Sequence, residues 1–306
     1  MRGRDATVLL ATWNGAQHLA AQIDSIAAQV DWGRIDLVAS DDGSNDGTLS
    51  LLAEAAAKWR RGRFEVVTGP AQGFAENFRS LLGREVTTPY VAFSDQDDIW
   101  LAGKLSAAAA ALSADDVPAL YCGRTQLVSA DDREIGLSPL FERPAGFANA
   151  LVQSIAGANT MVLNRAGYEL VKRAAARSGF VSHDWFCYQV IAGAGGRVIY
   201  DPVPQVRYRQ HGNNLVGANT GWRARLERLL RAWDGRFVDW NNRNLATLRA
   251  AADLLTPEAR ARLEEFDSAR HGKLKTRLQH LRRSGVYRQT RGGQASLWAA
   301  AVLGRL

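Results

Sequence analysis

The sequence predicts an α/β protein with a Rossmann-like, doubly wound and mostly parallel sheet, followed by a helical C-terminal extension. Over about the first 100 residues, apolar runs typical of buried strands alternate with segments of helical periodicity. The first four strand-like runs are apolar, but each ends in polar or acidic residues. Because doubly wound sheets bind ligands at the carboxyl ends of their strands, this pattern predicts a ligand site at one edge of the sheet.

Four strands and three helices are predicted for this first part of the chain. The run TVLLATW stops at Asn-Gly, and Leu19, Ile23 and Ile26 of the next segment share one helical face. The expected strands are residues 7–13, 34–44, 63–69 and 90–95, and the expected helices are residues 16–30, 46–60 and 73–85.

Strand and helix patterns continue to residue 211, and after GNNLVGANTGW, residues 212–222, the composition shifts to arginine-rich helical sequence. Residues 120–129 and 134–141 have strand or loop character, residues 159–176 a strand and then a helix, residues 182–196 a helix, and residues 197–211 β character. Two units are therefore expected, an α/β domain over residues 1–217 and a basic helical extension over residues 218–306.

Charge and cysteine content narrow the function classes. The two cysteines form no CxxC or Cys/His cluster, which argues against a disulfide framework and a zinc site. No apolar stretch has the length of a signal peptide or a membrane span, so a cytoplasmic location is expected. Residues 221–306 carry 18 Lys and Arg against 8 Asp and Glu, and so account for the net charge of +7. No nucleic-acid-binding module accompanies this charge, which argues against a nucleic-acid partner.

The stretch YVAFSDQDDIW, residues 90–100, places three carboxylates directly after a buried strand. Crowded carboxylates repel one another unless a cation offsets their charge, and Mg²⁺ is commonly held by one or two carboxylates together with substrate phosphates. Asp95 and Asp97 face the same side of an extended segment. The alternative is a solvated turn in which Asp97 or Asp98 caps a helix beginning near Ile99.

The stretch SDDGSNDGT, residues 40–48, ends the second strand with further acids. An acceptor carboxylate at Asp41 or Asp42 suits the imide N–H of uracil or thymine. The alternative is an ordinary turn, since Asp, Asn and Gly favour turns and Asp46 suits a helix N-cap.

Five stretches in order, TWNG, SDDGSNDGT, GFAENF, FSDQDDIW and HDW…YRQHGNN, make the sequence similar to the family 2 glycosyltransferases, which have a GT-A fold. It resembles their bacterial rhamnosyltransferase-like branch in cell-surface polysaccharide synthesis, over about the first 215 residues. The resemblance implies inverting transfer of a sugar, rhamnose as the first choice, from a dTDP- or UDP-linked donor with Mg²⁺ or Mn²⁺. The implied acceptor is a saccharide or a lipid-linked hydroxyl.

The resemblance also assigns roles to residues. Those implied to contact the nucleotide or the donor are Thr12, Asn14, Asp41, Asp42, Gly73, Asn77, Asp95, His183 and Arg209. Those implied at the metal are Asp97, Asp98 in support, and His211. Asp184 is implied as the general base, with Trp100 and Trp185 beside the acceptor pocket.

The residues themselves leave several of these roles open. A carboxylate pressed against Trp185 would lose solvation, which raises its pKa toward the value that a general base needs. Asp184 could instead cap a helix, and Trp100 and Trp185 could simply fill the core. His211 could instead be a polar surface residue.

The basic tail and the enzyme class also have alternatives. Leu226, Leu229, Leu230 and Trp233 form one helical stripe, which suits packing on the catalytic domain and is compatible with contact to a membrane surface. A nucleotidyltransferase would share the sheet and the acids, but TWNGAQHLAAQ lacks a glycine-rich phosphate loop. A non-catalytic nucleotide-sugar binder is distinguished only by turnover.

Overall fold

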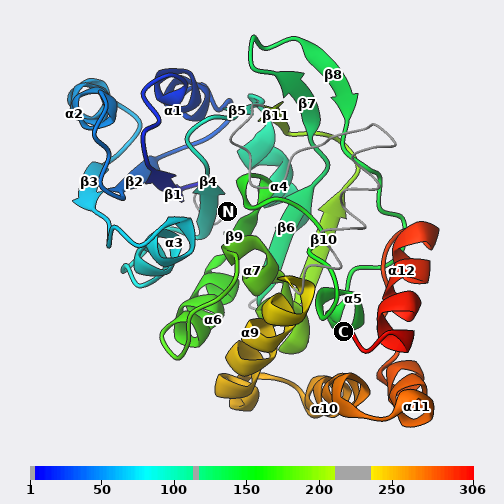
Figure 1. Cartoon of the computed structure of the whole chain (residues 1–306). Coiled ribbons are helices and arrows are strands. Elements are labelled where there is room, and N and C mark those ends of the chain that lie inside the picture. Colours follow the sequence, from blue (N-terminus) through cyan, green and yellow to red (C-terminus); the bar gives the residue numbers. More distant parts are fainter. Residues whose placement is uncertain (1–3, 113–116, 211–235) are drawn as a thin grey trace.

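The structure, a computed structural model, describes residues 4–112, 117–210 and 236–306 (Figure 1). Its centre is a seven-stranded sheet with the strand order β10-β6-β9-β4-β1-β2-β3. These strands are β1 (Ala6–Thr12), β2 (Ile35–Asp41), β3 (Phe64–Thr68), β4 (Tyr90–Ser94), β6 (Ala119–Gly123), β9 (Val162–Asn164) and β10 (Arg197–Asp201). Parallel pairing of β1 with β2 and β4, and of β2 with β3, confirms the predicted doubly wound sheet. The short strand β9 runs antiparallel between β4 and β6.

Helices cover both faces of this sheet. They are α1 (Leu19–Ala27), α2 (Thr48–Lys58), α3 (Phe74–Leu82), α4 (Lys104–Leu112), α5 (Phe147–Ala150), α6 (Arg165–Ala175) and α7 (His183–Gly193). Alternate residues of β1 point to opposite faces, as the pleat of a strand requires. Leu9 therefore packs in a core with α3, α6 and α7, whereas Val8 and Leu10 pack in a second core with α1, α2 and α4.

A smaller sheet with the order β5-β11-β7-β8 stands beside the main one. Its strands are β5 (Ile99–Trp100), β7 (Gln126–Ser129), β8 (Glu134–Leu137) and β11 (Val206–Gln210). The residues after the acidic stretch thus form a strand, so the alternative in which a helix begins near Ile99 is wrong. Pairing of β5 with β11 attaches the acidic stretch to a segment more than a hundred positions later, as the register of Trp100 with Val206 shows.

The C-terminal part is helical, as expected. It contains α9 (Arg236–Ala250), α10 (Pro257–His271), α11 (Leu274–Ser284) and α12 (Arg291–Val302). Leu263, Phe266 and Leu297 from these helices share a core with Phe147 and Leu151, so α10 and α12 pack on the region around α5. The predicted boundary at residue 217 and the predicted stripe at residues 226–233 lie outside the described residues. In the described ranges, no helix combines the length and the apolar character needed to cross a bilayer.

The register of the main sheet sets the position of the functional site. Thr12 pairs with Asp41, Asp41 pairs with Thr68, and Leu10 pairs with Ser94. The carboxyl ends of β1 to β4 therefore lie level with one another. The polar residues that follow these strands meet at one edge of the sheet.

Candidate active site

Asp41, at the end of β2, organises the loops around it. Its carboxylate accepts hydrogen bonds from Thr12 Oγ1 at 2.9 Å, Ser44 Oγ at 2.6 Å and Ser44 N at 2.9 Å. Asp41 is only 3% exposed. Both carboxylate oxygens are therefore engaged by the chain itself, and Asp41 links the end of β1 to the loop that follows β2.

We expect Asp41→Ala to lower the free energy of unfolding by about 2–4 kcal/mol, because it leaves buried donors of Thr12 and Ser44 without an acceptor. Urea denaturation followed by circular dichroism measures the change. Asp24→Ala is the matched control, since Asp24 is exposed on α1. Equal effects of the two substitutions would show that Asp41 does not hold these loops.

Asp42 holds the loop between β3 and α3 in a similar way. Its two carboxylate oxygens accept from Ala71 N at 2.8 Å and Gly73 N at 2.7 Å. Gly73 has φ +90°, a conformation that favours glycine, and precedes α3 directly. Asn77, fully buried on α3, donates from Nδ2 to Ser40 O at 2.9 Å. These residues shape the loop that the resemblance places over the nucleotide.

The tip of the loop after β1 presents Trp13, which is 61% exposed. Gln96 fixes its backbone by accepting from Trp13 N at 2.8 Å and donating from Nε2 to Trp13 O at 2.9 Å. Asn14, with φ 48°, donates from its backbone N–H to Ser44 Oγ at 2.8 Å. An exposed aromatic side chain thus stands on a rigid turn between the ends of β2 and β4.

Four aspartates gather after β4 and at the start of α7. Burial, and then the charges of Asp97 and Asp184, raise the pKa of Asp95 to about 7. Tyr208 on β11 lies among all four acids. Its pKa is raised by burial and then by the charges of Asp98, Asp95, Asp97 and Asp184. Residues from β4, α7 and β11 therefore converge on one acidic centre.

Asp98 forms the buried floor of this centre. It is 1% exposed, accepts from Arg209 N at 3.1 Å and accepts a hydrogen bond from Asn159 Nδ2. Burial and the charges of the neighbouring aspartates raise the pKa of its carboxyl well above the usual range. Asp98 connects the acidic stretch to β11, which suits a supporting acid.

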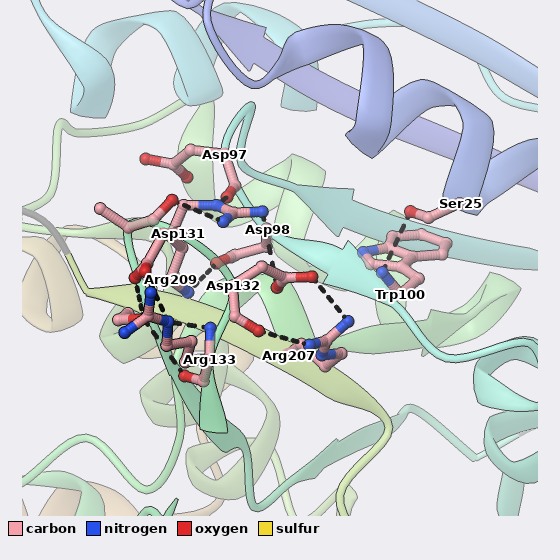
Figure 2. A network of polar contacts seen from close by, with 11 residues as sticks. Ser25, Asp97, Asp98, Trp100, Asp131, Asp132, Arg133, Arg207 and Arg209 are labelled. Carbon is pink, nitrogen blue, oxygen red and sulfur yellow. Dashed lines mark hydrogen bonds and ion pairs between the residues drawn. The ribbon is translucent and has the colours of Figure 1, made fainter. Parts of the chain in front are cut away.

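Arg209 holds the backbone of the acidic stretch through hydrogen bonds (Figure 2). Its Nε donates to Asp97 O at 3.1 Å and its Nη1 donates to Ala130 O at 3.0 Å. Asp132, at the tip of the β7–β8 hairpin, lies 3.8 Å from the Arg209 guanidinium and pairs with Arg207 at 2.9 Å. Arg209 is 5% exposed, and these contacts hold the backbone of Asp97, whereas the resemblance implied contact with the nucleotide or the donor.

Asp184 lies in the first turn of α7, partly exposed, where Ser154 Oγ donates to its carboxylate at 3.1 Å. Burial raises its pKa. The adjacent His183 points into the core. Its ring stacks on that of Phe78, with 3.5 Å between the ring centroids, and makes an edge contact with Phe93. It is 4% exposed, and burial lowers its pKa to about 3. The expected contact of His183 with the donor does not fit this position, because neutral His183 packs as an aromatic core residue.

The expectation that Trp100 and Trp185 line the acceptor pocket does not fit their burial either. Trp100 is 3% exposed, and the Lys104 ammonium lies 3.2 Å from the centroid of its ring. Trp185 is 6% exposed and donates from Nε1 to Ala150 O at 2.6 Å. Both indoles fill the core, which is the alternative that their apolar character allowed.

The acidic centre fits a divalent cation that is shared with a substrate. In the part of the chain that the structure describes, no group of three or more His, Cys, Asp or Glu side chains could hold a metal alone. Burial, and then the negative charges of Asp97 and Asp184, nevertheless raise the pKa of Asp95, and a bound cation would offset those charges. One or two carboxylates completed by phosphate oxygens are a usual arrangement for Mg²⁺. His211, the other expected ligand, lies outside the described residues.

Sequence reasoning missed several residues of this site. Trp13 stands within the TWNG stretch, and its place after an apolar strand was the available signal for an exposed side chain at this edge of the sheet. Gln96 lies between Asp95 and Asp97, and of these three residues only the two aspartates were assigned roles from the sequence. Tyr208 and Asn159 carry no local signal, because only the pairing of distant segments brings them to the acids.

Comparison with known proteins agrees with this geometry. Residues 7–166 match the model of the family described as Glycosyl transferase family 2. The chain is 29% identical over 235 residues to the dTDP-rhamnosyl transferase RfbG of Shigella flexneri, covering 72% of this chain and 78% of the relative.

Solved structures with the same fold include TarS residues 1–349 of S. aureus in complex with UDP-GlcNAc. It has a TM-score of 0.54 and 14% identity, and the match covers 94% of this chain and 93% of that one. Another is the mannosyltransferase PcManGT from Pyrobaculum calidifontis in complex with GDP-Man and Mn²⁺. It has a TM-score of 0.50 and 19% identity, with 100% and 86% covered. The predicted GT-A fold is confirmed, and the chain belongs to glycosyl transferase family 2.

Proposed function

We propose that this protein transfers a sugar, rhamnose as the first choice, from a dTDP-linked donor to a hydroxyl acceptor with inversion at the anomeric carbon. The convergence of Asp95, Asp97 and Asp184 at the carboxyl edge of the sheet is the observation that carries the proposal. Similarity to a dTDP-rhamnosyl transferase supports the sugar and the nucleotide. A UDP-linked sugar is the second choice of donor. The acceptor would be a saccharide or a lipid-linked hydroxyl in the cytoplasm.

The donor would lie across the ends of β1, β2 and β4. Asp41 and Asp42 act indirectly here, because they hold the loops around the nucleotide. Trp13 supplies an exposed aromatic face for the base. Asp97 would hold Mg²⁺ or Mn²⁺, and Asp95 would lie beside the ribose or the donor sugar. The bound cation would neutralise negative charge on the diphosphate as it departs.

Asp184 would take the proton of the acceptor hydroxyl. The hydroxyl oxygen then bonds to the anomeric carbon as the bond from that carbon to the diphosphate oxygen breaks. Attack from the face opposite the diphosphate inverts the configuration. The Ser154 hydroxyl orients the Asp184 carboxylate, and burial raises its pKa toward the value that favours proton transfer.

A thermal-shift screen of nucleotide sugars tests this proposal. We expect dTDP-rhamnose to raise the melting temperature in the presence of Mn²⁺ and to raise it much less after chelation with EDTA. Incubation of the same donor with saccharide and lipid-linked acceptors then separates an enzyme from a non-catalytic binder. A protein that no nucleotide sugar stabilises, with or without Mn²⁺, would contradict the proposal.

We expect Trp13→Ala to weaken binding of dTDP by about 10- to 100-fold, because stacking of a base on an aromatic side chain contributes about 1–3 kcal/mol. Isothermal titration calorimetry in the presence of Mn²⁺ measures the change. Trp298→Ala is the matched control, since Trp298 is exposed on the distant helix α12. Unchanged affinity of Trp13→Ala would remove Trp13 from the nucleotide site.

A further inference from the structure

Helix α12 exposes an apolar stripe. Trp298 is 37% exposed, and Val302 and Leu303 are each 51% exposed. The opposite side of the same helix is buried through Leu297 and Ala301. One face of α12 therefore packs on the protein, and the other presents large apolar side chains to the surroundings.

The start of α11, which carries a further exposed apolar side chain, lies near the end of α12. Arg277 donates from Nη1 to Ala301 O at 2.8 Å, which places the first turn of α11 against the end of α12. Leu274, in that turn, is 50% exposed. We call Leu274, Trp298, Val302 and Leu303 the α12 patch. Helices α11 and α12 lie on the opposite side of the molecule from β1, β2 and β3 (Figure 1).

The segment of sequence that carries the α12 patch is basic. After Asp267 the sequence contains no Asp or Glu, whereas residues 268–306 contain nine Lys and Arg. Lys273 and Lys275 are exposed and flank Leu274 in sequence, and exposed Arg305 lies two positions after Leu303. Apolar side chains bordered by cations are typical of helices that lie in the interface of an anionic bilayer.

The same charge disfavours a second copy of the chain as the occupant. A two-fold contact through the α12 patch would bring Lys273, Lys275 and Arg305 of each copy toward their counterparts, and like charges repel. A lipid surface instead supplies apolar acyl chains for the patch and anionic headgroups for the cations that border it.

We propose that the α12 patch docks on the surface of a bilayer that contains anionic phospholipids. Trp298 would lie at the level of the headgroups, with Val302, Leu303 and Leu274 below them, while Lys273 and Lys275 contact lipid phosphates. This inference gives the membrane contact expected of the basic tail a defined surface. It does not depend on the donor, the metal or the transfer reaction, so it stands or falls separately from the proposed function.

Flotation with lipid vesicles tests the inference on the full-length protein. We expect binding to vesicles made of equal parts of phosphatidylglycerol and phosphatidylcholine, and at least about 10-fold weaker binding to pure phosphatidylcholine. Trp298→Ser/Val302→Ser should weaken binding about 10-fold or more through lost apolar contact. Val203→Ser, at an exposed valine outside the patch, should leave binding unchanged.

Two pairs of charge-reversal variants distinguish the effect of charge beside the α12 patch from the effect of the net charge of the protein. Lys273→Glu/Lys275→Glu should lower binding to anionic vesicles at least about 10-fold, whereas Lys58→Glu/Arg60→Glu, with the same change in net charge on α2 and its end, should have a small effect. Melting temperatures confirm that each variant is folded. Equal losses in the two pairs, or a wild-type protein that ignores anionic vesicles, would overturn the inference. If the wild-type protein binds no vesicles but sediments as a dimer, and Trp298→Ser/Val302→Ser sediments as a monomer, the patch would instead bind a second copy of the chain.

Discussion

Replacement of Asp97 by Asn is expected to abolish the Mn²⁺-dependent part of donor binding. The amide has nearly the same shape as the carboxylate but lacks the negative charge that would hold a divalent cation beside the diphosphate. Loss of that charge also relieves repulsion, since the charge of Asp97 adds to burial in raising the pKa of Asp95 and of Asp98. The variant should therefore stay folded while it loses metal-dependent affinity.

Calorimetric titration of dTDP with Mn²⁺ and with EDTA measures this effect. In the wild-type protein Mn²⁺ should tighten binding, and in Asp97→Asn the two titrations should coincide. Asp36→Asn provides a control aspartate at the opposite, amino-terminal part of β2. Mn²⁺-dependent affinity that survives unchanged in Asp97→Asn would refute the metal role of this residue.

The second large effect is expected for Asp184→Asn, which should lower kcat by about 10²- to 10⁴-fold and leave donor affinity close to the wild-type value. The amide cannot accept the proton of the acceptor hydroxyl. It can still accept the hydrogen bond from Ser154 Oγ, so the start of α7 should keep its structure. A loss confined to kcat would distinguish a base from a residue that only binds the donor.

The pH dependence of the wild-type rate gives an independent readout. A base must be deprotonated to act, and burial raises the pKa of Asp184. The rate should therefore fall as the pH drops through a value above the ordinary pKa of aspartate, and this acidic limb should disappear in Asp184→Asn. Near-normal turnover of the variant, or an unchanged acidic limb, would rule out Asp184 as the base.

Much of the fold follows from local sequence patterns. Apolar runs ended by Asn, Asp or Gly correspond to β1, β2 and β4, because burial on both faces requires continuous apolar sequence in parallel strands. The run that corresponds to β3 lies at the edge of the sheet and is largely exposed. The short antiparallel strand β9 and the pairing of β5 with β11 escaped this reasoning. Strands of two or three residues show no periodicity, and their place depends on partners that are distant in sequence.

For the site, the sequence likewise predicts where the polar residues lie but not which partners they bind. The sequence correctly indicates that polar strand ends meet at one edge, because parallel strands in register must bring them together. It does not reveal how the acids are used. The carboxylates of Asp41 and Asp42 accept hydrogen bonds from backbone amides and hydroxyls of neighbouring loops. The guanidinium of Arg209 donates hydrogen bonds to the backbone of Asp97 and of the β7–β8 hairpin. Such assignments depend on three-dimensional hydrogen-bond geometry, which residue types alone do not specify.

The central claim is that a divalent cation ties the acids of the sheet edge to the donor diphosphate. Crystals grown with dTDP and MnCl₂ test it most directly, because Mn²⁺ can be located by its anomalous scattering. The account predicts an anomalous peak within about 2–2.5 Å of an Asp97 carboxylate oxygen and of a diphosphate oxygen, with the thymine ring of dTDP beside Trp13. Bound dTDP with Mn²⁺ remote from Asp97, or dTDP bound away from the ends of β1, β2 and β4, would contradict it.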